Sequence, residues 1–134
     1  MNSKINMSHD GRVMTVTYYG HIDIDEILAS IRARMDHNNG ETIKKLKVLL
    51  LDHTYAESID MSNEDIIRSV EENRKIADIN PDITFICIMP RTVGFGLSRM
   101  WQIYAEIHDV RLGSHLVKTA EEANSIIQEI LQQA

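Results

Sequence analysis

The sequence has little of several things, and each shortage restricts what the protein does. It contains one cysteine, Cys87, so no disulfide can form within the chain. We expect this thiol, in the apolar run from Ile83 to Met89, to be buried and inert. The N-terminus lacks the apolar core of a secretory signal, and no stretch approaches the length of a membrane span. These absences predict a soluble, cytoplasmic protein.

Basic residues are also in deficit, with 14 lysines and arginines against 20 aspartates and glutamates, for a net charge of −6. Nucleic acids and anionic membranes bind cationic faces, so the charge balance argues against both as partners. The 6 histidines are scattered, with no pair at the i, i+4 spacing of a zinc-binding helix. We therefore expect no metal site and no cofactor.

What the chain does contain is a regular alternation of strand and helix signals. At 134 residues it is expected to form one domain, residues 1–134. Residues 3–8 and 12–19 flank Asp10-Gly11, which predicts an opening β-hairpin, and Gly20 is expected to end its second strand. Asp23 is expected to cap the following helix, which stops at Asn38-Asn39-Gly40.

Beyond this first helix the alternation continues to the C-terminus. "LKVLLLDHT" and "ITFICIM" are apolar runs typical of strands buried on both faces, and "DVRLGSHLVK" is a weaker strand. Helical stripes follow each of them, with Ser62 and Thr119 as predicted caps. The order β-β-α-β-α-β-α-β-α predicts an α/β fold with a mixed, mostly parallel sheet of four or five strands and about four helices.

The segment between Met89 and Trp101 joins an apolar strand to a helix through Gly94-Phe95-Gly96. It has neither the lysine of a P-loop nor the third glycine of the dinucleotide fingerprint. The simplest interpretation is a tight corner whose free amides can hold an anion. The candidate ligand or anion residues are Arg91, Gly94, Phe95, Gly96, Arg99, Trp101 and Tyr104.

A polar stretch follows the run "KVLLLD". Asp52 is expected to end that strand, and ligand sites of α/β sheets gather at the carboxyl ends of strands. The stretch from Asp52 to Ser62 is either a recognition surface that can be phosphorylated or an acidic loop in which Ser62 only caps the next helix. The candidate docking or regulatory residues are Asp52, His53, Tyr55, Ser58, Asp60 and Ser62.

The pattern over nearly the whole chain resembles a known bacterial family. "VMTVTYYGHIDIDEIL", "KVLLLDHT", "GFGLSRMWQIYAEI" and "VRLGSHLVKTAEEANSII" are similar to the SpoIIAA-like, STAS/SEC14-related small domains. The resemblance implies the STAS fold of anti-sigma-factor antagonists. It also implies an Asp-Ser pair whose serine, once phosphorylated, blocks partner docking. Asp60 matches that aspartate, but Met61 follows it; Ser62 lies one position late and Ser58 lies two positions before Asp60.

Three hypotheses of function follow. The first is a non-enzymatic regulatory domain that docks a protein partner or a second copy of itself as a homodimer, without a phosphorylatable serine at the expected position. The second, implied by the SEC14 relationship, is a protein that binds a small apolar, anionic or lipid-like ligand. The third is a small hydrolase using Ser98, since Gly96-Leu97-Ser98 partly matches the Gly-x-Ser-x-Gly elbow and His108, Asp109 and His115 follow.

Overall fold

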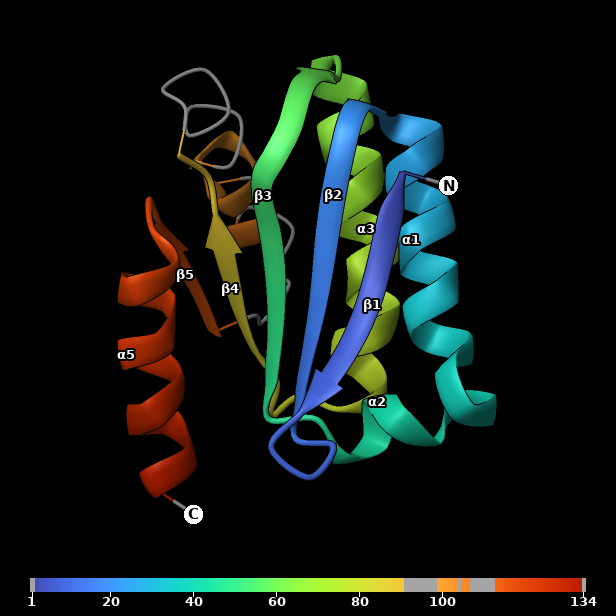
Figure 1. Ribbon diagram of the computed structural model, residues 1–134. Helices are drawn as coiled ribbons and strands as arrows, with labels where there is room; N and C mark the ends of the chain where they lie inside the picture. Colours follow the sequence, from blue (N-terminus) through green and yellow to red (C-terminus); the bar gives the residue numbers. More distant parts are fainter. Residues whose placement is uncertain (1, 91–98, 104, 107–112, 134) are drawn as a thin grey trace.

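Five strands form a single sheet with helices on both of its faces (Figure 1). The computed structural model describes residues 2–90, 99–103, 105–106 and 113–133. The strands are β1 (Ser3–Ser8), β2 (Val13–Asp23), β3 (Val48–Asp60), β4 (Thr84–Ile88) and β5 (Gly113–Val117). The helices are α1 (Ile24–Asp36), the 3-10 turn η1 (His37–Gly40), α2 (Glu41–Lys45), α3 (Asn63–Ile79) and α5 (Ala120–Gln132). Residues 99–103 and 105–106 are also helical.

The strands lie in the sheet in the order in which they occur in the chain, β1-β2-β3-β4-β5. β1 and β2 are antiparallel and joined by the expected hairpin, whereas β2, β3, β4 and β5 are all parallel to one another. A parallel pair needs a long crossover between its strands, and α1 and α3 supply the first two. The mixed, mostly parallel sheet expected from the alternation of elements is confirmed.

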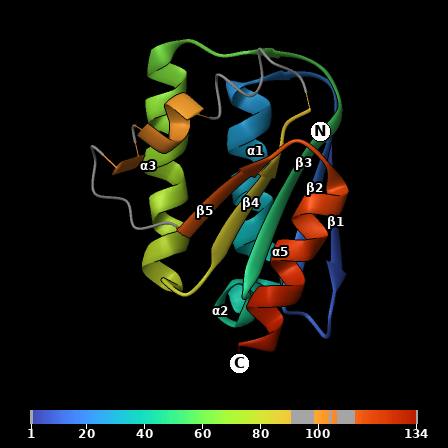
Figure 2. The same cartoon turned by 90° about the vertical axis from the view of Figure 1, so that its left-hand side faces the viewer.

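Each face of the sheet has its own apolar core. α1, α2 and α3 cover one face and α5 covers the other (Figure 2). Because side chains alternate along a strand, β2 contributes to both cores: Met14, Val16 and Tyr18 pack toward α1 and α3, and Val13 packs toward α5. The cavity described below lies on the α1–α3 side.

The helix caps lie where the local sequence predicts them. Asp23 accepts a hydrogen bond from the backbone N–H of Glu26 at 3.0 Å, and Thr119 accepts one from Glu122. Ser62 and Asp65 form a reciprocal capping box at the start of α3. These bonds satisfy backbone donors that an α-helix leaves without intrahelical partners, so the sequence places helix starts well.

Two strand ends predicted from the sequence are wrong. Gly20 does not end β2, and Asp52 does not end β3: β2 runs on to Asp23 and β3 runs on to Asp60. The two strands continue as a pair, with register shifts between Thr17 and Tyr19 and between Gly20 and His21. Gly20 has φ +68°, a left-handed value that glycine adopts without steric cost. It therefore allows the strand to continue through the irregular pairing instead of ending it.

A further difference is that the short helix α2 was not predicted. Its five residues are too few to show a helical period in the sequence. The part of β3 beyond its pairing with β4, residues 53–60, is called the β3 extension below. Among the described residues this extension pairs with β2 alone, because the pairing of β3 with β4 ends at Asp52 and Ile88.

Candidate functional site

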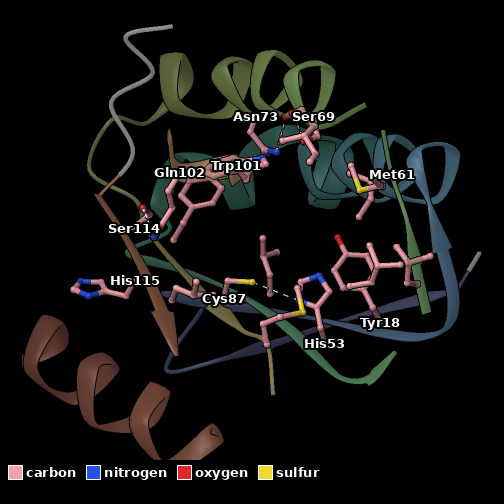
Figure 3. A pocket seen from close by; sticks show the side chains of 18 of the residues that line it. Tyr18, His53, Met61, Ser69, Asn73, Cys87, Trp101, Gln102, Ser114 and His115 are labelled. Carbon is pink, nitrogen blue, oxygen red and sulfur yellow. Dashed lines mark hydrogen bonds between the residues drawn. The ribbon is translucent and has the colours of Figure 1, made fainter. Parts of the chain in front are cut away.

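A cavity of about 110 Å³ lies between the sheet, α3 and the helical residues 99–103 (Figure 3). Figure 3 shows Tyr18, His53 and Cys87 on the sheet side, and Ser69, Asn73 and Trp101 on the helical side. The remaining wall is mostly apolar: Ile22, Ile27, Leu51, Ile59, Met61, Ile66, Phe85, Met89 and Leu116. A concave, apolar space with a few polar groups is the usual form of a small-molecule site.

The most unusual residue of the cavity wall is Arg34, which comes from the buried face of α1 and is 1% exposed. Its guanidinium donates through Nη2 to the Tyr18 hydroxyl at 2.5 Å and to Ser30 Oγ at 3.2 Å. Through Nη1 it donates to Asn73 Oδ1 at 3.2 Å. The Tyr18 and Ser30 hydroxyls are themselves 2.9 Å apart. Arg34 therefore joins α1, β2 and α3 through neutral groups.

No carboxylate of the described residues pairs with this buried guanidinium. The two salt bridges found between described residues, Lys44 to Glu41 and Lys75 to Glu72, both lie on the surface and do not involve Arg34. Arg34 Nε is buried with no hydrogen-bond partner among the same residues. Removing a guanidinium from water costs several kcal/mol unless a counter-charge and a full set of acceptors replace the water. One wall of the cavity thus carries a positive charge that its described surroundings do not neutralise.

His53, on β3, is the second titratable group of the wall. Its ring stacks on Tyr18, with ring centroids 4.8 Å apart, and its Nδ1 lies 3.3 Å from the Ile88 carbonyl oxygen. Burial lowers the pKa of His53 from 6.5 to about 4, although the Ile88 carbonyl and the Asp52 carboxylate act in the opposite direction, and the positive charge of Arg34 lowers it further. His53 is therefore neutral at pH 7, whereas Arg34, among the described residues of the wall, carries a positive charge.

Cys87 differs from its sequence prediction. It is half-buried, lines the cavity, and its Sγ lies 3.5 Å from His53 Nδ1. The apolar run that contains it faces both cores, and the position of Cys87 in that run puts it on the cavity side. A neutral imidazole does not stabilise a thiolate as an imidazolium does, so this pair lacks the electrostatics of a cysteine–histidine nucleophile.

The candidate docking residues divide between the inside and the outside of the molecule. His53 is buried in the cavity wall, while Tyr55, Ser58 and Asp60 are exposed on the β3 extension. Asp52 is half-buried and accepts hydrogen bonds at Oδ1 from the backbone and the hydroxyl of Thr54. His53 and Tyr55 are two residues apart and would share a face of a regular strand. The register shift between Thr17 and Tyr19, where β3 has one residue more than β2, puts them on opposite faces.

The exposed side of the β3 extension carries an aromatic pair. Tyr55 is 60% exposed and stacks on Tyr19 of β2, which is 44% exposed, with ring centroids 5.8 Å apart. Nearby, Ser58 Oγ lies 2.5 Å from His21 Nδ1. Ser62, at the end of this segment, is engaged in the capping box of α3.

Of the residues predicted to hold a ligand or an anion, Arg99 is exposed and Trp101 lines the cavity, where it stacks on Phe85. Arg91, Gly94, Phe95, Gly96 and Tyr104 lie outside the described residues, as do Ser98, His108 and Asp109 of the hydrolase hypothesis. Sequence reasoning missed Arg34 as a site residue. The signal was present, since Arg34 falls on the same helical face as Ile27 and Ile31, where a charge is unexpected.

Comparison with solved structures places the fold. The chain is similar to "Structure of the Anti-Sigma Factor Antagonist SpoIIAA in its Unphosphorylated Form", with a TM-score of 0.56 and 12% identity over 94% of this chain and 97% of that one. It is also similar to "Structure of the Bacillus Cell Fate Determinant SpoIIAA in the Phosphorylated Form", with a TM-score of 0.53 and 12% identity over 93% of this chain and 98% of that one.

At this identity the likeness concerns the fold, and it confirms the STAS-like, SpoIIAA-like architecture that the sequence resemblance implies. No family model matches the sequence, and no curated protein matches it. None of the helices in the described part of the chain is long and apolar enough to cross a bilayer.

Proposed function

We propose that this protein is a non-enzymatic regulatory domain that docks a protein partner through the segment from Asp52 to Ser62. The observation that carries the proposal is the aromatic pair Tyr19–Tyr55, exposed on a strand pair that extends beyond the rest of the sheet. Exposed tyrosines supply much of the binding energy at protein interfaces, because they bury a large rigid area and keep a polar tip. The SpoIIAA-like fold, which an anti-sigma-factor antagonist also has, supports the proposal.

Regulation by a phosphate at the residue after Asp60 is not part of the proposal. That residue is Met61, whose side chain lines the cavity. Ser62 is poorly suited to replace it, because its hydroxyl is engaged in the capping box of α3, which a phosphate would disrupt beside the acidic residues Glu64 and Asp65. Ser58, exposed beside His21, is the serine of this segment with room for a phosphate.

The test compares Tyr55→Ser with a matched control, Ile79→Ser, which removes an exposed apolar side chain at the far end of α3. Immobilised wild-type protein captures partners from cells of the source organism, and the dissociation constant of each purified partner is then measured. We expect Tyr55→Ser to raise the dissociation constant of the true partner about tenfold or more. We expect Ile79→Ser to leave that dissociation constant unchanged. A second copy of the chain is also a possible partner, and sedimentation equilibrium measures the dissociation constant of that self-association for the wild-type protein and both variants. Equal binding by both variants would refute docking at this surface.

A second candidate function, binding of a small ligand, is favoured by the cavity and its buried arginine. A volume of about 110 Å³ is well below the roughly 300 Å³ of the smallest usual drug-sized pockets, so a small molecule fits better than a lipid with long acyl chains. Native mass spectrometry of freshly purified protein tests it. A mass increment that is lost on denaturation supports a bound ligand.

A further inference from the structure

We propose that the cavity binds a small monocarboxylate with a compact apolar body, and that Arg34 anchors its carboxylate. This inference deepens the second candidate function and rests on it, since it names the chemical class of the ligand. It starts from a juxtaposition of observations: a buried, unneutralised guanidinium and an apolar space that the same residue lines.

The buried positive charge of the Arg34 guanidinium favours an anion beside it. Arg34 has three neutral acceptors, Tyr18, Ser30 and Asn73, and its Nε has none among the described residues. Neutral acceptors satisfy N–H groups but do not compensate a buried positive charge. Three of the five guanidinium donors are taken by these groups, so a carboxylate beside Arg34 would supply the missing charge and accept from the donors that remain.

The other charged or titratable groups near the cavity do not already fill this role. His53 is neutral at pH 7 because burial lowers its pKa to about 4. The Asp52 carboxylate raises the pKa of His53, but Asp52 is not among the described residues that line the cavity. His115, the remaining histidine of the wall, is exposed. Among the described residues that line the cavity, Arg34 therefore presents one positive charge to a ligand.

One positive charge favours a monoanion. A phosphate dianion would leave about one negative charge uncompensated in an apolar space, at the desolvation cost that disfavours an unpaired buried ion. A carboxylate at neutral pH carries the single charge that Arg34 balances.

The size and walls of the cavity define the rest of the ligand. An engineered apolar cavity of roughly 150 Å³ takes up benzene, so a space of about 110 Å³ suits a body of about that size or smaller. Phe85, Trp101 and the aliphatic side chains around them offer it aromatic and aliphatic contacts, and polar substituents would lose hydration there. Benzoate and 3-methylbutanoate have the required shape.

The chain provides its own reporter for a direct test. It has one tryptophan, and Trp101 lines the cavity, so its fluorescence follows a ligand that enters. Benzoate and 3-methylbutanoate are titrated into the wild-type protein and compared with benzamide and 3-methylbutanamide, which have nearly the same shape and no charge. We expect each carboxylate to bind about tenfold or more tightly than its amide, as a charged hydrogen bond to a buried group predicts.

Two variants then assign the preference to a residue. Arg34→Met removes the guanidinium and keeps an unbranched side chain, and we expect it to reduce the preference for carboxylate over amide to less than about twofold. Arg32→Met is the matched control: it removes the same charge from an exposed position on the same helix, and the preference is expected to stay. Circular dichroism tests whether each variant is folded.

The outcomes separate the two levels of the proposal. Equal binding of carboxylates and amides by the wild-type protein would overturn the anion anchor and leave the small-ligand function standing. No binding of any of the four compounds would overturn both. If Arg34→Met does not fold, the preference of the wild-type protein for carboxylate over amide still decides the ligand class. If Arg32→Met loses that preference, the preference comes from the general surface charge and the anchor at Arg34 is overturned.

Discussion

At the scale of single residues, Arg34 is the feature that the fold itself does not explain. Its side chain is 1% exposed, and its partners are two hydroxyls and an amide. Each such bond contributes about 1.5–3 kcal/mol when one group is charged. The desolvation of the guanidinium costs several kcal/mol in return, so the residue contributes little net stability without a counter-ion.

The substitution Arg34→Met tests this balance. We expect the free energy of unfolding of the variant to stay within about 2 kcal/mol of that of the wild-type protein, because the desolvation cost that is removed offsets the cost of leaving the buried Asn73 Oδ1 without its donor. Urea unfolding at pH 7 without added carboxylate measures it. A loss of about 3 kcal/mol or more would show that Arg34 is a structural residue whose hydrogen bonds outweigh its desolvation.

His53 gives the cavity a defined response to acid. Because its pKa is lowered from 6.5 in the unfolded chain to about 4 in the folded protein, the unfolded state binds more protons between these values. Stability is therefore kept above pH 6.5 and falls as the pH drops toward 4, by about 3 kcal/mol from this residue over the full window.

The variant His53→Phe keeps a ring that can stack on Tyr18 and removes the titration. Between pH 7 and pH 4 we expect the unfolding free energy of the variant to fall by about 3 kcal/mol less than that of the wild-type protein. Urea unfolding at a series of pH values measures both. Parallel pH profiles would mean that His53 keeps its ordinary pKa in the folded state.

At the scale of elements, the continuation of β2 and β3 past the other strands decides which surface is available for docking. Residues 54–60, most of them polar, remain extended because β2 pairs with them. β2 can do so because Gly20 adopts φ +68° between two register shifts. A side chain at position 20 would meet no closer neighbour than Asn2 Nδ2, at 3.9 Å. Any cost of substitution there is therefore conformational rather than steric.

The prediction at this scale concerns Gly20→Ala. We expect it to lower the free energy of unfolding by roughly 1–2 kcal/mol, the cost of a left-handed backbone for an L-residue with a Cβ. Gly20→Asn should cost less, since asparagine tolerates this conformation better. Thermal and urea unfolding compare the three proteins. Equal losses for alanine and asparagine would point to a packing effect instead.

At the scale of the whole molecule, the cavity and the proposed docking surface share a segment. Ile59 and Met61 line the cavity, while Tyr55, Ser58 and Asp60 of the same stretch are exposed. A ligand that contacts Ile59 and Met61 would restrict the motion of the backbone that presents the exposed residues. Ligand binding and partner binding would then be coupled, and by linkage each would change the affinity of the other equally.

Hydrogen exchange tests this coupling without a known partner. With saturating benzoate we expect amide exchange to slow by about threefold or more in residues 55–62 of the wild-type protein, since a bound ligand stabilises the closed form by mass action. Arg34→Met under the same conditions should show no such change. Slowing confined to β4 and residues 99–103 would place the ligand in the cavity and leave the docking segment uncoupled.

The sequence alone was sufficient for the order of the main elements, the caps at Asp23, Ser62 and Thr119, and the hairpin at Asp10-Gly11. These features depend on neighbours within about four residues, and local hydrogen bonds and periodicity report them directly. Trp101 could also be predicted as a pocket residue, because it lies on the apolar stripe that faces the sheet.

The tertiary structure alone decided where β2 and β3 end and what surrounds Arg34. Polar residues become strand when a partner strand lies beside them, and that pairing joins positions more than 30 residues apart, as in Tyr19 with Tyr55. Tyr18, Arg34, His53 and Asn73 likewise come from four separate elements. Whether a buried charge has a counter-ion depends on packing between such elements, and no local pattern records it.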